Sequence, residues 1–594
     1  MVRFFLTLPL TLDNHIPSDD TSPEGYSMAL KICLIGRPAI VADSGGEQFL
    51  RSHQAWALLA RLVLQKRPID RRRLAGELFP ETQDPLGALR WCLGAIRKTL
   101  GAPESLRGDP VQLKFPPDTE VDVWRINEPD FEINEVGEFL EGVEPRCSPE
   151  LSTWLLVERE RIAGLVEGHI RNRVLANLSS GNASGAIRFA ELGARLRPYD
   201  EGAHILLVKS LAEAGRHEAA AQHIDNTQKV FTAELGEKPS AALWSAGRRA
   251  VSSPPVGVRS EAVAVSLLES GLAAVAAGAV EAGIDCLRRS IAVAESSSSR
   301  ELVANTTLEL GVALVHSLRG YDDEGAVLLQ RATTIALECG AQATAAKALR
   351  ELGYVEALAG RRPSAEHFLD QALKLAEDLG ALAGIHAVIG FNLVDWGRVR
   401  EGLEHYEISL SHARQTRSRR REIWSLGLGA WGLLKADRLG DAEHWLANCL
   451  ELVDEQNWVA FKPWPTAVQA EVRLRQQVDP SAIRKTLEGA FALSCQIGDP
   501  CWEAATARVI GLTHLAEDHY DVAAEWLSQA RARCLKQTDR FAALLVAIIS
   551  DQMNMSVKTG LLKDARGFAR ELIPCAARAH MDREVRLATA VLAL

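Results

Sequence analysis

The chain has 594 residues, 47% of them apolar and 24% charged, which is typical of a globular protein with three or four domains. Its net charge of −10 argues against a generic polyanion binder, and its ten scattered cysteines form no CxxC pair, as expected for reduced thiols. No apolar run reaches membrane-spanning length, and together with the reduced thiols this leads us to expect a cytoplasmic protein.

The segment 1–28 contains a polar run, HIPSDDTSPEGYS, which predicts a disordered tail. The apolar stretch Phe4–Leu12 follows Arg3 as in a secretion signal, but no small-residue cleavage site comes after it. An alternative is that translation starts at Met28, directly before the apolar run ALKICLIG.

Short strands and three helices are expected next. Residues 29–41 are β-rich with a turn near Gly36, and residues 52–65 form an amphipathic helix that Pro68 ends. Asp70 is placed to cap a second helix, RRRLAGELF. Residues 111–115 and 120–124 alternate like strands around a Pro-Pro pair, and this order of elements predicts a winged helix-turn-helix with a hairpin wing.

The third helix, DPLGALRWCLGAIRKTLG, is interpreted as the recognition helix. Asp84 suits the N-cap, Pro85 the first helical position and Gly101 the C-terminus. Its apolar residues recur every three or four positions and predict one buried stripe: Leu89, Leu93, Ile96 and Leu100. The opposite face carries cations around a small residue: Arg90, Gly94, Arg97 and Lys98. The alternative is an ordinary amphipathic helix with a solvated basic face.

The charge around this helix differs from that of the whole chain. Between Arg51 and Arg107 there are roughly 11 Lys and Arg against 5 Asp and Glu, about +6 locally. A basic module therefore lies inside an acidic protein.

Two groups of segments carry a family resemblance. The runs ALKICLIGRPAI, AWALLARLVL, GALRWCLGAIRKTLG and VDVWRI resemble the OmpR/PhoB-type winged helix of bacterial SARP transcriptional activators. The following runs FLEG, TWLLVERERI, GNASGAIRFAELGARLRPYDEGAHILLVKSLAEAGRHEAAAQHI and ELGEKPSAAL resemble the all-helical bacterial transcriptional activator domain of the same family. The resemblance extends from Ala29 to Arg249. It implies promoter binding at direct repeats, pairing on DNA and contact with RNA polymerase.

The chain departs from this family at positions that usually contact DNA. His53 and Gln54 stand where basic residues are usual, and Gly94 and Ala95 replace a Ser–Arg pair in the recognition helix. The run Arg71–Arg73 is a candidate replacement for these phosphate contacts. The departures leave open a rival interpretation, a repeat-based interaction scaffold whose winged helix no longer binds specific DNA.

After the Pro/Ser-rich segment SSPPVG the sequence is helical and repetitive. Small residues recur about every 40 positions: Gly271, Gly311, Gly353, Gly390, Ala430, Ala470 and Gly511. The spacing of small and large residues after them predicts about seven helix pairs packed like tetratricopeptide repeats. Trp458 and Trp464 are expected mainly in the core. Alternatively, they fit a loop that interrupts the repeats and could line a concave binding surface.

These features predict a mainly α fold: a winged helix-turn-helix with short strands, an all-α activator-type domain and an α-solenoid. The expected units are a disordered tail (1–28), a winged-helix DNA-binding domain (29–127), an activator-like helical domain (128–250), a linker (251–260) and a tetratricopeptide-like solenoid (261–594).

Catalytic and cofactor motifs were not found. The sequence has no GxxxxGK[ST] loop, no HExxH, no GxSxG and no spaced Cys/His ligand set, so we expect neither an enzyme nor a cofactor or metal.

The sequence-based hypothesis is a sequence-specific DNA-binding regulator, favoured as an activator, whose repeats sense an unknown protein or small molecule. Arg90, Gly94 and Arg97 are expected to face bases and nearby phosphates in the major groove. The expected phosphate contacts are Arg72, Arg73, Lys98, Arg107 and Lys114.

Overall fold

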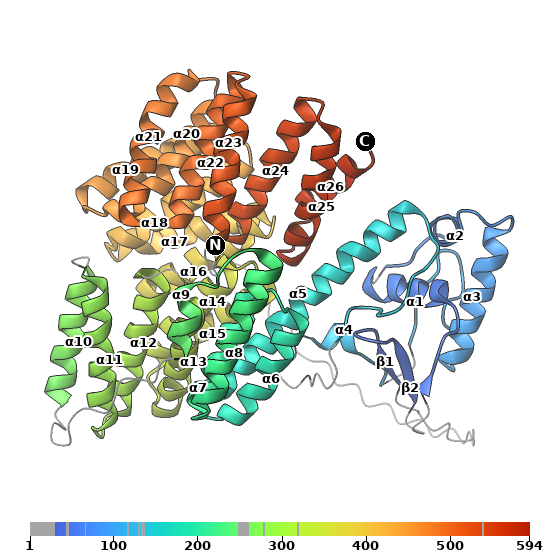
Figure 1. Ribbon diagram of the computed structural model, residues 1–594, viewed down its shortest axis with the longest axis horizontal. Coiled ribbons are helices and arrows are strands. Elements are labelled where there is room, and N and C mark those ends of the chain that lie inside the picture. Colours follow the sequence, from blue (N-terminus) through green and yellow to red (C-terminus); the bar gives the residue numbers. More distant parts are fainter. Residues whose placement is uncertain are drawn as a thin grey trace, which may run out of the picture.

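The computed structural model describes residues 30–594 apart from residues 43–46, 66, 116–117, 127, 129–130, 132–136, 248–260, 277–278, 318–319 and 537–539. It confirms the predicted mainly helical fold, with a small sheet near the N-terminus and a long helical solenoid (Figure 1). The predicted disordered tail and the 251–260 linker lie outside the described residues.

A four-stranded sheet opens the described chain. The strands are β1 (Leu30–Cys33), β2 (Ala39–Ala42), β3 (Glu47–Gln48) and β4 (Glu120–Val121), in the spatial order β3-β2-β1-β4. β1 pairs antiparallel with β2, Leu30 opposite Ala42, and parallel with β4, Lys31 opposite Glu120. Gly36 turns the chain between β1 and β2 with φ +77°, a conformation that glycine adopts without steric cost.

The prediction that residues 111–115 and 120–124 pair as a hairpin wing is wrong. Val111 forms an isolated bridge with Ile69, and β4 pairs with β1 instead of with residues 111–115. Directly after β4 the chain enters the short helix α4 (Asp122–Arg125). The physical cause is Asp122, whose Oδ2 accepts the backbone N–H groups of Leu34 (2.7 Å) and Ile35 (2.8 Å) and so fixes α4 at the end of β1.

The buried Asp122 carboxyl gives the fold a pH dependence. Burial raises its pKa to about 6, against hydrogen bonds from Ile35 and Leu34 that lower it. Because the pKa is raised in the folded state, the fold favours the protonated form of Asp122. This contribution to stability is fully present below the unfolded pKa of about 4 and is lost as the pH rises from about 4 to about 6.

We expect Asp122→Asn to remove this dependence. As the pH rises from 4 to 7, the wild type should lose about 3 kcal/mol of unfolding free energy that the variant keeps, because a pKa difference of two units corresponds to roughly that amount. Denaturant unfolding of both proteins across this range measures the difference. A constant difference would mean that Asp122 ionises as freely in the fold as in the unfolded chain.

Three helices pack on the sheet and form the predicted helix-turn-helix. They are α1 (His53–Gln65), α2 (Arg71–Leu78) and α3 (Pro85–Thr99). Asp70 caps α2 as predicted, because its side chain accepts the N–H of Arg73 at 3.0 Å. The inner residues of all three helices join the main hydrophobic core.

The next helices lie between the winged helix and the solenoid. They are α5 (Pro149–Ser179), α6 (Ala183–Leu196), α7 (Glu201–Glu213), α8 (His217–Val230) and α9 (Ala241–Ala246), with a π-helical turn at Phe231–Leu235 after α8. α5 has 31 residues and extends from the winged helix to the repeats (Figure 1). It is thus the physical link between the two parts.

The solenoid contains eight helix pairs and a final helix within the described residues, one pair more than the sequence predicts. The pairs are α10 (Glu261–Ala276) and α11 (Val280–Glu295), α12 (Arg300–Ser317) and α13 (Asp322–Cys339), α14 (Gln342–Leu358) and α15 (Arg362–Leu375), α16 (Leu379–Asp395) and α17 (Val399–Gln415), α18 (Arg419–Lys435) and α19 (Leu439–Glu455), α20 (Pro463–Arg475) and α21 (Pro480–Ile497), α22 (Pro500–Ala516) and α23 (Tyr520–Leu535), and α24 (Ala542–Lys558) and α25 (Leu562–Arg578). A 3₁₀ turn, Val459–Phe461, precedes α20, and α26 (Asp582–Leu592) ends the chain.

The repeating small residues pack as the sequence predicts. Each of the seven lies in the first helix of a pair. A methyl group placed on Gly271 or Gly353 would come within 3.0 Å of a leucine of the second helix, and one on Gly390 would meet the ring of Tyr406 at 2.9 Å. Small residues at these positions therefore allow the paired helices to approach closely.

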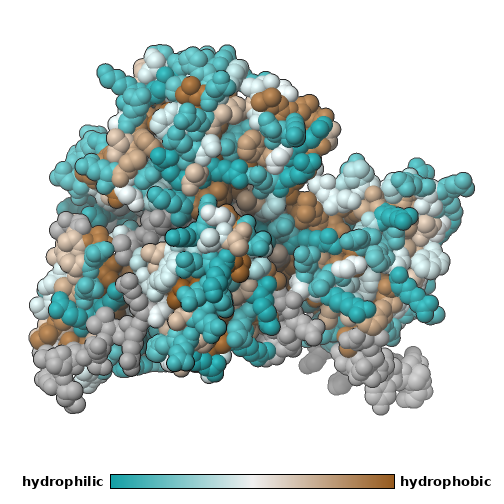
Figure 2. Space-filling model, viewed as in Figure 1, coloured by the Kyte–Doolittle hydropathy of each residue, from teal (hydrophilic) through white to brown (hydrophobic). Residues whose placement is uncertain are grey.

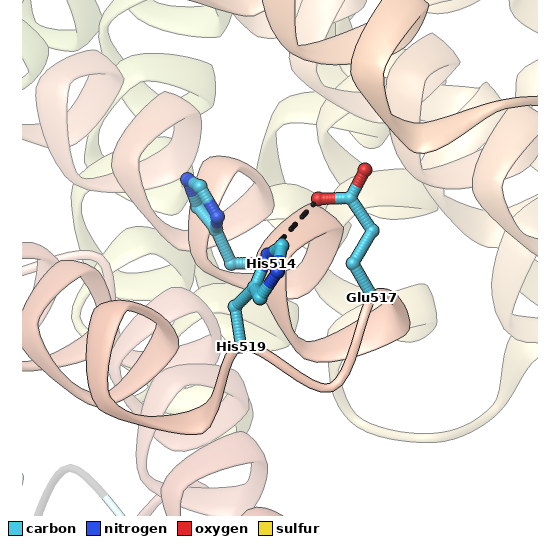
Figure 3. Close-up of side chains that lie close together, drawn as sticks. All are labelled: His514, Glu517 and His519. Atoms are coloured by element: carbon cyan, nitrogen blue, oxygen red, sulfur yellow. Dashed lines mark ion pairs between the residues drawn. The ribbon is translucent and has the colours of Figure 1, made fainter.

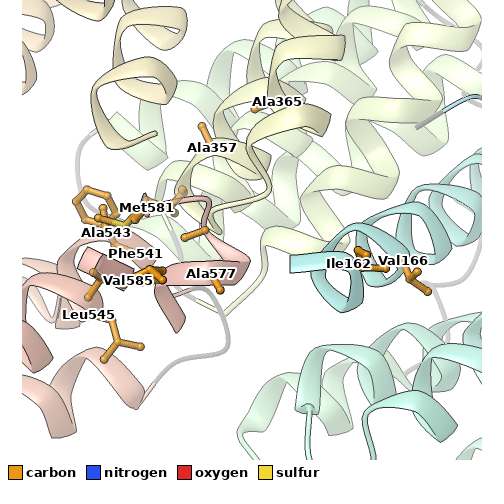
Figure 4. Close-up of a cluster of buried hydrophobic side chains, with 14 of the residues drawn as sticks. Ile162, Val166, Ala357, Ala365, Phe541, Ala543, Leu545, Ala577, Met581 and Val585 are labelled. Atoms are coloured by element: carbon orange, nitrogen blue, oxygen red, sulfur yellow. The ribbon is translucent and has the colours of Figure 1, made fainter. Parts of the chain in front are cut away.

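The C-terminal end of the solenoid returns to α5. Figure 1 shows α25 and α26 beside α5, although the whole run of repeats separates them in sequence. Ile162 and Val166 of α5 belong to the same buried cluster as Ala577, Met581 and Val585 near the C-terminus (Figure 4). The C-terminal repeats and the helices before the solenoid therefore share one hydrophobic core, whereas α10 and α11 pack in separate clusters.

Candidate nucleic-acid interface

The local sequence of α3 explains where this helix begins and ends. Oδ1 of Asp84 accepts the N–H of Gly87 at 2.9 Å, and Pro85 occupies the first turn. Gly101 adopts φ +61° just after the helix. The predicted stripe of Leu89, Leu93, Ile96 and Leu100 is buried, with at most 3% exposure. α3 is thereby held against the core with one face outward, on the side of the molecule away from the solenoid (Figure 1).

The outward face of α3 combines cations, an aromatic ring and a gap. The Arg90 side chain is 68% exposed, and its guanidinium lies 3.8 Å from Asp84. Lys98 is exposed, and a methyl group on Gly94 would meet only Nη2 of Arg97, at 3.9 Å. Trp91 is 64% exposed, and sequence reasoning missed it because tryptophans usually belong to cores. This face presents both donors and an apolar surface to a partner.

Arg97 lies differently from Arg90. It is half-buried, and its Nη1 donates to the backbone oxygen of Leu106 at 3.4 Å. Contact with a base edge would require the guanidinium to leave this long hydrogen bond. The loss is small, because hydrogen bonds weaken at such distances.

The arginines at the start of α2 have three different environments. Nε of Arg71 donates to the backbone oxygen of Gly108 at 2.6 Å, which ties α2 to the loop after α3. Arg73 is 61% exposed but pairs with Glu77 at 2.8 Å. Arg72 is exposed beside the N-terminus of α2. Arg72 is thus the most accessible cation of this run.

The remaining predicted cations lie in the segment after α3. Nε of Arg107 donates to the oxygen of Pro103 at 2.9 Å, and its guanidinium lies 3.1 Å from Glu104. Lys114 is exposed, and its backbone N–H is bound by the Ser105 hydroxyl at 3.0 Å. Both side chains are carried by a loop segment, since the predicted hairpin does not form.

The winged helix is fixed to the N-terminal half of α5. Arg159 donates to the backbone oxygens of Phe139, Leu140 and Val143, at 2.9–3.4 Å, and this segment is bonded to the end of β1 through the Leu140 N–H and the Leu34 oxygen at 2.8 Å. The Arg61 guanidinium stacks over the Trp154 ring at 4.7 Å. A displacement of α5 would therefore be transmitted to the winged helix.

Ion pairs fix the rest of α5 to the solenoid. Arg171 binds Asp323 of α13 at 2.7 Å and Glu356 of α14 at 2.5 Å, and the Glu356 side chain is 1% exposed. Near the C-terminus, Arg578 binds Glu160 and Glu167 of α5 at 2.7–2.8 Å. We call these six residues the α5 clamp. The Arg171–Glu356 pair is buried and is therefore harder to separate than a surface pair, whereas the Arg578 pairs are half-buried.

The middle segment of the chain matches a known family. Residues 136–249 match the model of the bacterial transcriptional activator domain. The predicted resemblance to the activator domain is confirmed over these residues, and the chain combines this domain with tetratricopeptide-like helical repeats. No curated protein matches the chain.

Several solved structures are similar over parts of the chain. EmbR of Mycobacterium tuberculosis, in complex with a low-affinity phosphopeptide, is 17% identical over 37% of this chain and 64% of its own, with a TM-score of 0.28. A signal transduction ATPase with a tetratricopeptide repeat sensor from Pyrococcus horikoshii is 11% identical over 84% of this chain and 73% of its own (TM-score 0.37). Aspartyl phosphate phosphatase F from Bacillus subtilis is 10% identical over 69% and 93% (TM-score 0.37).

The outer surface carries few apolar side chains in the view of Figure 2. The visible face is mostly hydrophilic, with hydrophobic side chains in small scattered groups. In the part of the chain that the structure describes, no helix is both long enough and apolar enough to span a bilayer.

Proposed function

We propose that the protein is a sequence-specific DNA-binding transcriptional regulator. The observation that carries the proposal is the outward face of α3, where Arg90, Trp91, Gly94 and Lys98 are grouped beside a domain of the transcriptional activator family. An α-helix of this size fits the major groove, where arginine reads guanine edges. Gly94 leaves the backbone free to approach a phosphate.

The other cations have a supporting role in this proposal. Lys98, Arg72, Arg73, Arg107 and Lys114 would contact phosphates and set the orientation of α3, without selecting sequence. The activator-type domain would pair two copies on direct repeats and contact RNA polymerase, which makes activation the favoured sign of regulation.

The α5 clamp supports a role for the repeats as a sensor. Because α5 contacts the winged helix at one end, through Trp154 and Arg61, and α13, α14 and α25 along the rest, a protein or small ligand that moves the repeats would also move α5. The repeats would thus restrain or release DNA binding.

Selection of binding sites from a random DNA pool by the full chain tests the proposal. Enrichment of a shared direct repeat supports it. A pool without enrichment favours the rival scaffold, in which the outward face of α3 binds a protein.

The salt dependence of binding tests the phosphate contacts at α2. Replacing Arg72 and Arg73 by alanine should reduce the slope of log K against log salt by roughly two, since each phosphate contact releases counterions. The preferred DNA sequence should be retained. Arg125→Ala, on α4, is a matched control that should leave the slope unchanged. A double variant with the wild-type slope would remove this arginine run from the interface.

A further inference from the structure

The turn between α22 and α23 brings three potential metal ligands together. His514 lies in the last turn of α22, Glu517 caps its C-terminus and His519 is the N-cap of α23. One ligand atom from each side chain lies within 4.8 Å of the other two (Figure 3). Across the described residues, no other set of three His, Cys, Asp or Glu side chains meets this criterion.

The backbone of this turn is fixed by hydrogen bonds. The N–H groups of Glu517 and His519 both donate to the oxygen of His514, at 3.1 and 2.9 Å. Oδ1 of Asp518 accepts from the Tyr520 hydroxyl at 2.7 Å and from Nζ of Lys558 on α24 at 2.8 Å. The three ligands therefore start from defined positions, which reduces the entropic cost of gathering them.

Both imidazoles are suited to donate a lone pair. Nδ1 of His514 is buried and has no hydrogen-bond partner, which is rare for a polar atom. Nδ1 of His519 lies 3.4 Å from Oε2 of Glu517, and its side chain is 61% exposed, which gives a metal ion access from solvent.

The surrounding charges permit a divalent cation. Arg484 hydrogen-bonds Oε2 of Glu517 and donates from Nε to the Thr513 hydroxyl at 3.1 Å, so it orients the carboxylate and leaves Oε1 for a metal. The negative charge of Glu488 also acts on His514. Two carboxylates against one guanidinium leave the site with a net negative charge, and a partner that orients a ligating carboxylate is typical of metal sites.

We propose that His514, Glu517 and His519 bind a divalent transition-metal ion of the zinc class, with one coordination position open. Two imidazoles and one carboxylate match the ligands of zinc, cobalt and nickel better than those of calcium or magnesium. Tetrahedral geometry at Zn–N distances near 2.0 Å needs ligand atoms about 3.3 Å apart, which rotation of the exposed His519 side chain can supply. The open position would accept water or a group from a partner bound to the repeats.

Cobalt binding to the full-length chain, after chelator dialysis, is the direct test. We expect one equivalent of Co²⁺ to give visible d–d absorption that Zn²⁺ abolishes by competition. All ten cysteines are free thiols, and binding to them would instead give an intense thiolate charge-transfer band in the near ultraviolet. The two ligand types are therefore distinguishable in one spectrum.

Variants assign the ligands. His514→Gln and His519→Gln should each weaken Co²⁺ binding roughly 100-fold, since loss even of an outer partner costs about 10–100-fold. His444→Gln, at an exposed site on α19, should bind like the wild type. Absence of the d–d spectrum, its persistence in both ligand variants, or a dominant thiolate band would overturn the proposal.

Discussion

Arg171→Ala is expected to destabilise the protein by about 3–5 kcal/mol, the usual cost of removing one partner from a buried ion pair. The Arg171 side chain is 10% exposed and contacts Asp323 and Glu356. Burial alone would raise the pKa of Glu356, but the guanidiniums of Arg361 and Arg171 lower it below the usual range. Without Arg171, Glu356 keeps only the Arg361 contact, and Asp323 loses its partner on α5.

Chemical unfolding and hydrogen exchange in α5 measure this effect. Because the Glu356 pKa is lowered in the fold, its stabilising contribution is present at neutral pH and is lost as the pH falls below 4.5 toward the folded pKa. The difference between wild type and variant should therefore shrink in acid. Arg216→Ala, an exposed arginine before α8, is the control. A loss below about 1 kcal/mol would mean that the clamp contributes no more than a surface pair.

Arg97→Ala is expected to weaken binding to the selected DNA site by about 1–3 kcal/mol, or roughly 5- to 150-fold, because arginine is the commonest reader of guanine. Arg90→Ala should have an effect of the same size, since Arg90 is the more exposed of the two. Both losses should be much smaller on unrelated DNA. Equilibrium binding to both DNAs at one salt concentration measures the difference. An equal loss on both DNAs would make Arg97 a phosphate contact.

Local features of the fold could be predicted from the sequence. Capping by Asp70 and Asp84 and the buried stripe of α3 depend on neighbouring residues only. The small residues of the solenoid were found for the same reason, because the two helices of each pair follow one another directly in the chain.

Features that depend on distant contacts could not be predicted. The alternation of residues 120–124 indicated a strand, but the chain turns into helix α4 at Asp122. The cause is the bond between the Asp122 carboxylate and the backbone N–H of Leu34, which lies just after β1 and far from Asp122 in the sequence. Trp464 was expected mainly in the core, and it is 1% exposed. The partner of its indole N–H, the backbone oxygen of Gly427 on α18, lies too far away in the sequence to be predicted. The contact between α5 and Arg578 follows from the curvature of the whole solenoid, which no repeat period specifies.

Two side-chain groups were missed for different reasons. Trp91 has no signal in one sequence that separates an exposed tryptophan from a core one. The pattern His-x₂-Glu-x-His at residues 514–519 spans a helix end and a turn, so its spacing matches no metal motif that lies within one helix, such as HExxH.

Mapping the protein across its genome, with the wild type and an Arg90→Ala/Arg97→Ala variant side by side, tests the central claim most directly. The account predicts discrete wild-type sites that share a direct repeat and disappear in the variant. No discrete sites, or the same sites in both proteins, would contradict it and show that the outward face of α3 does not select DNA.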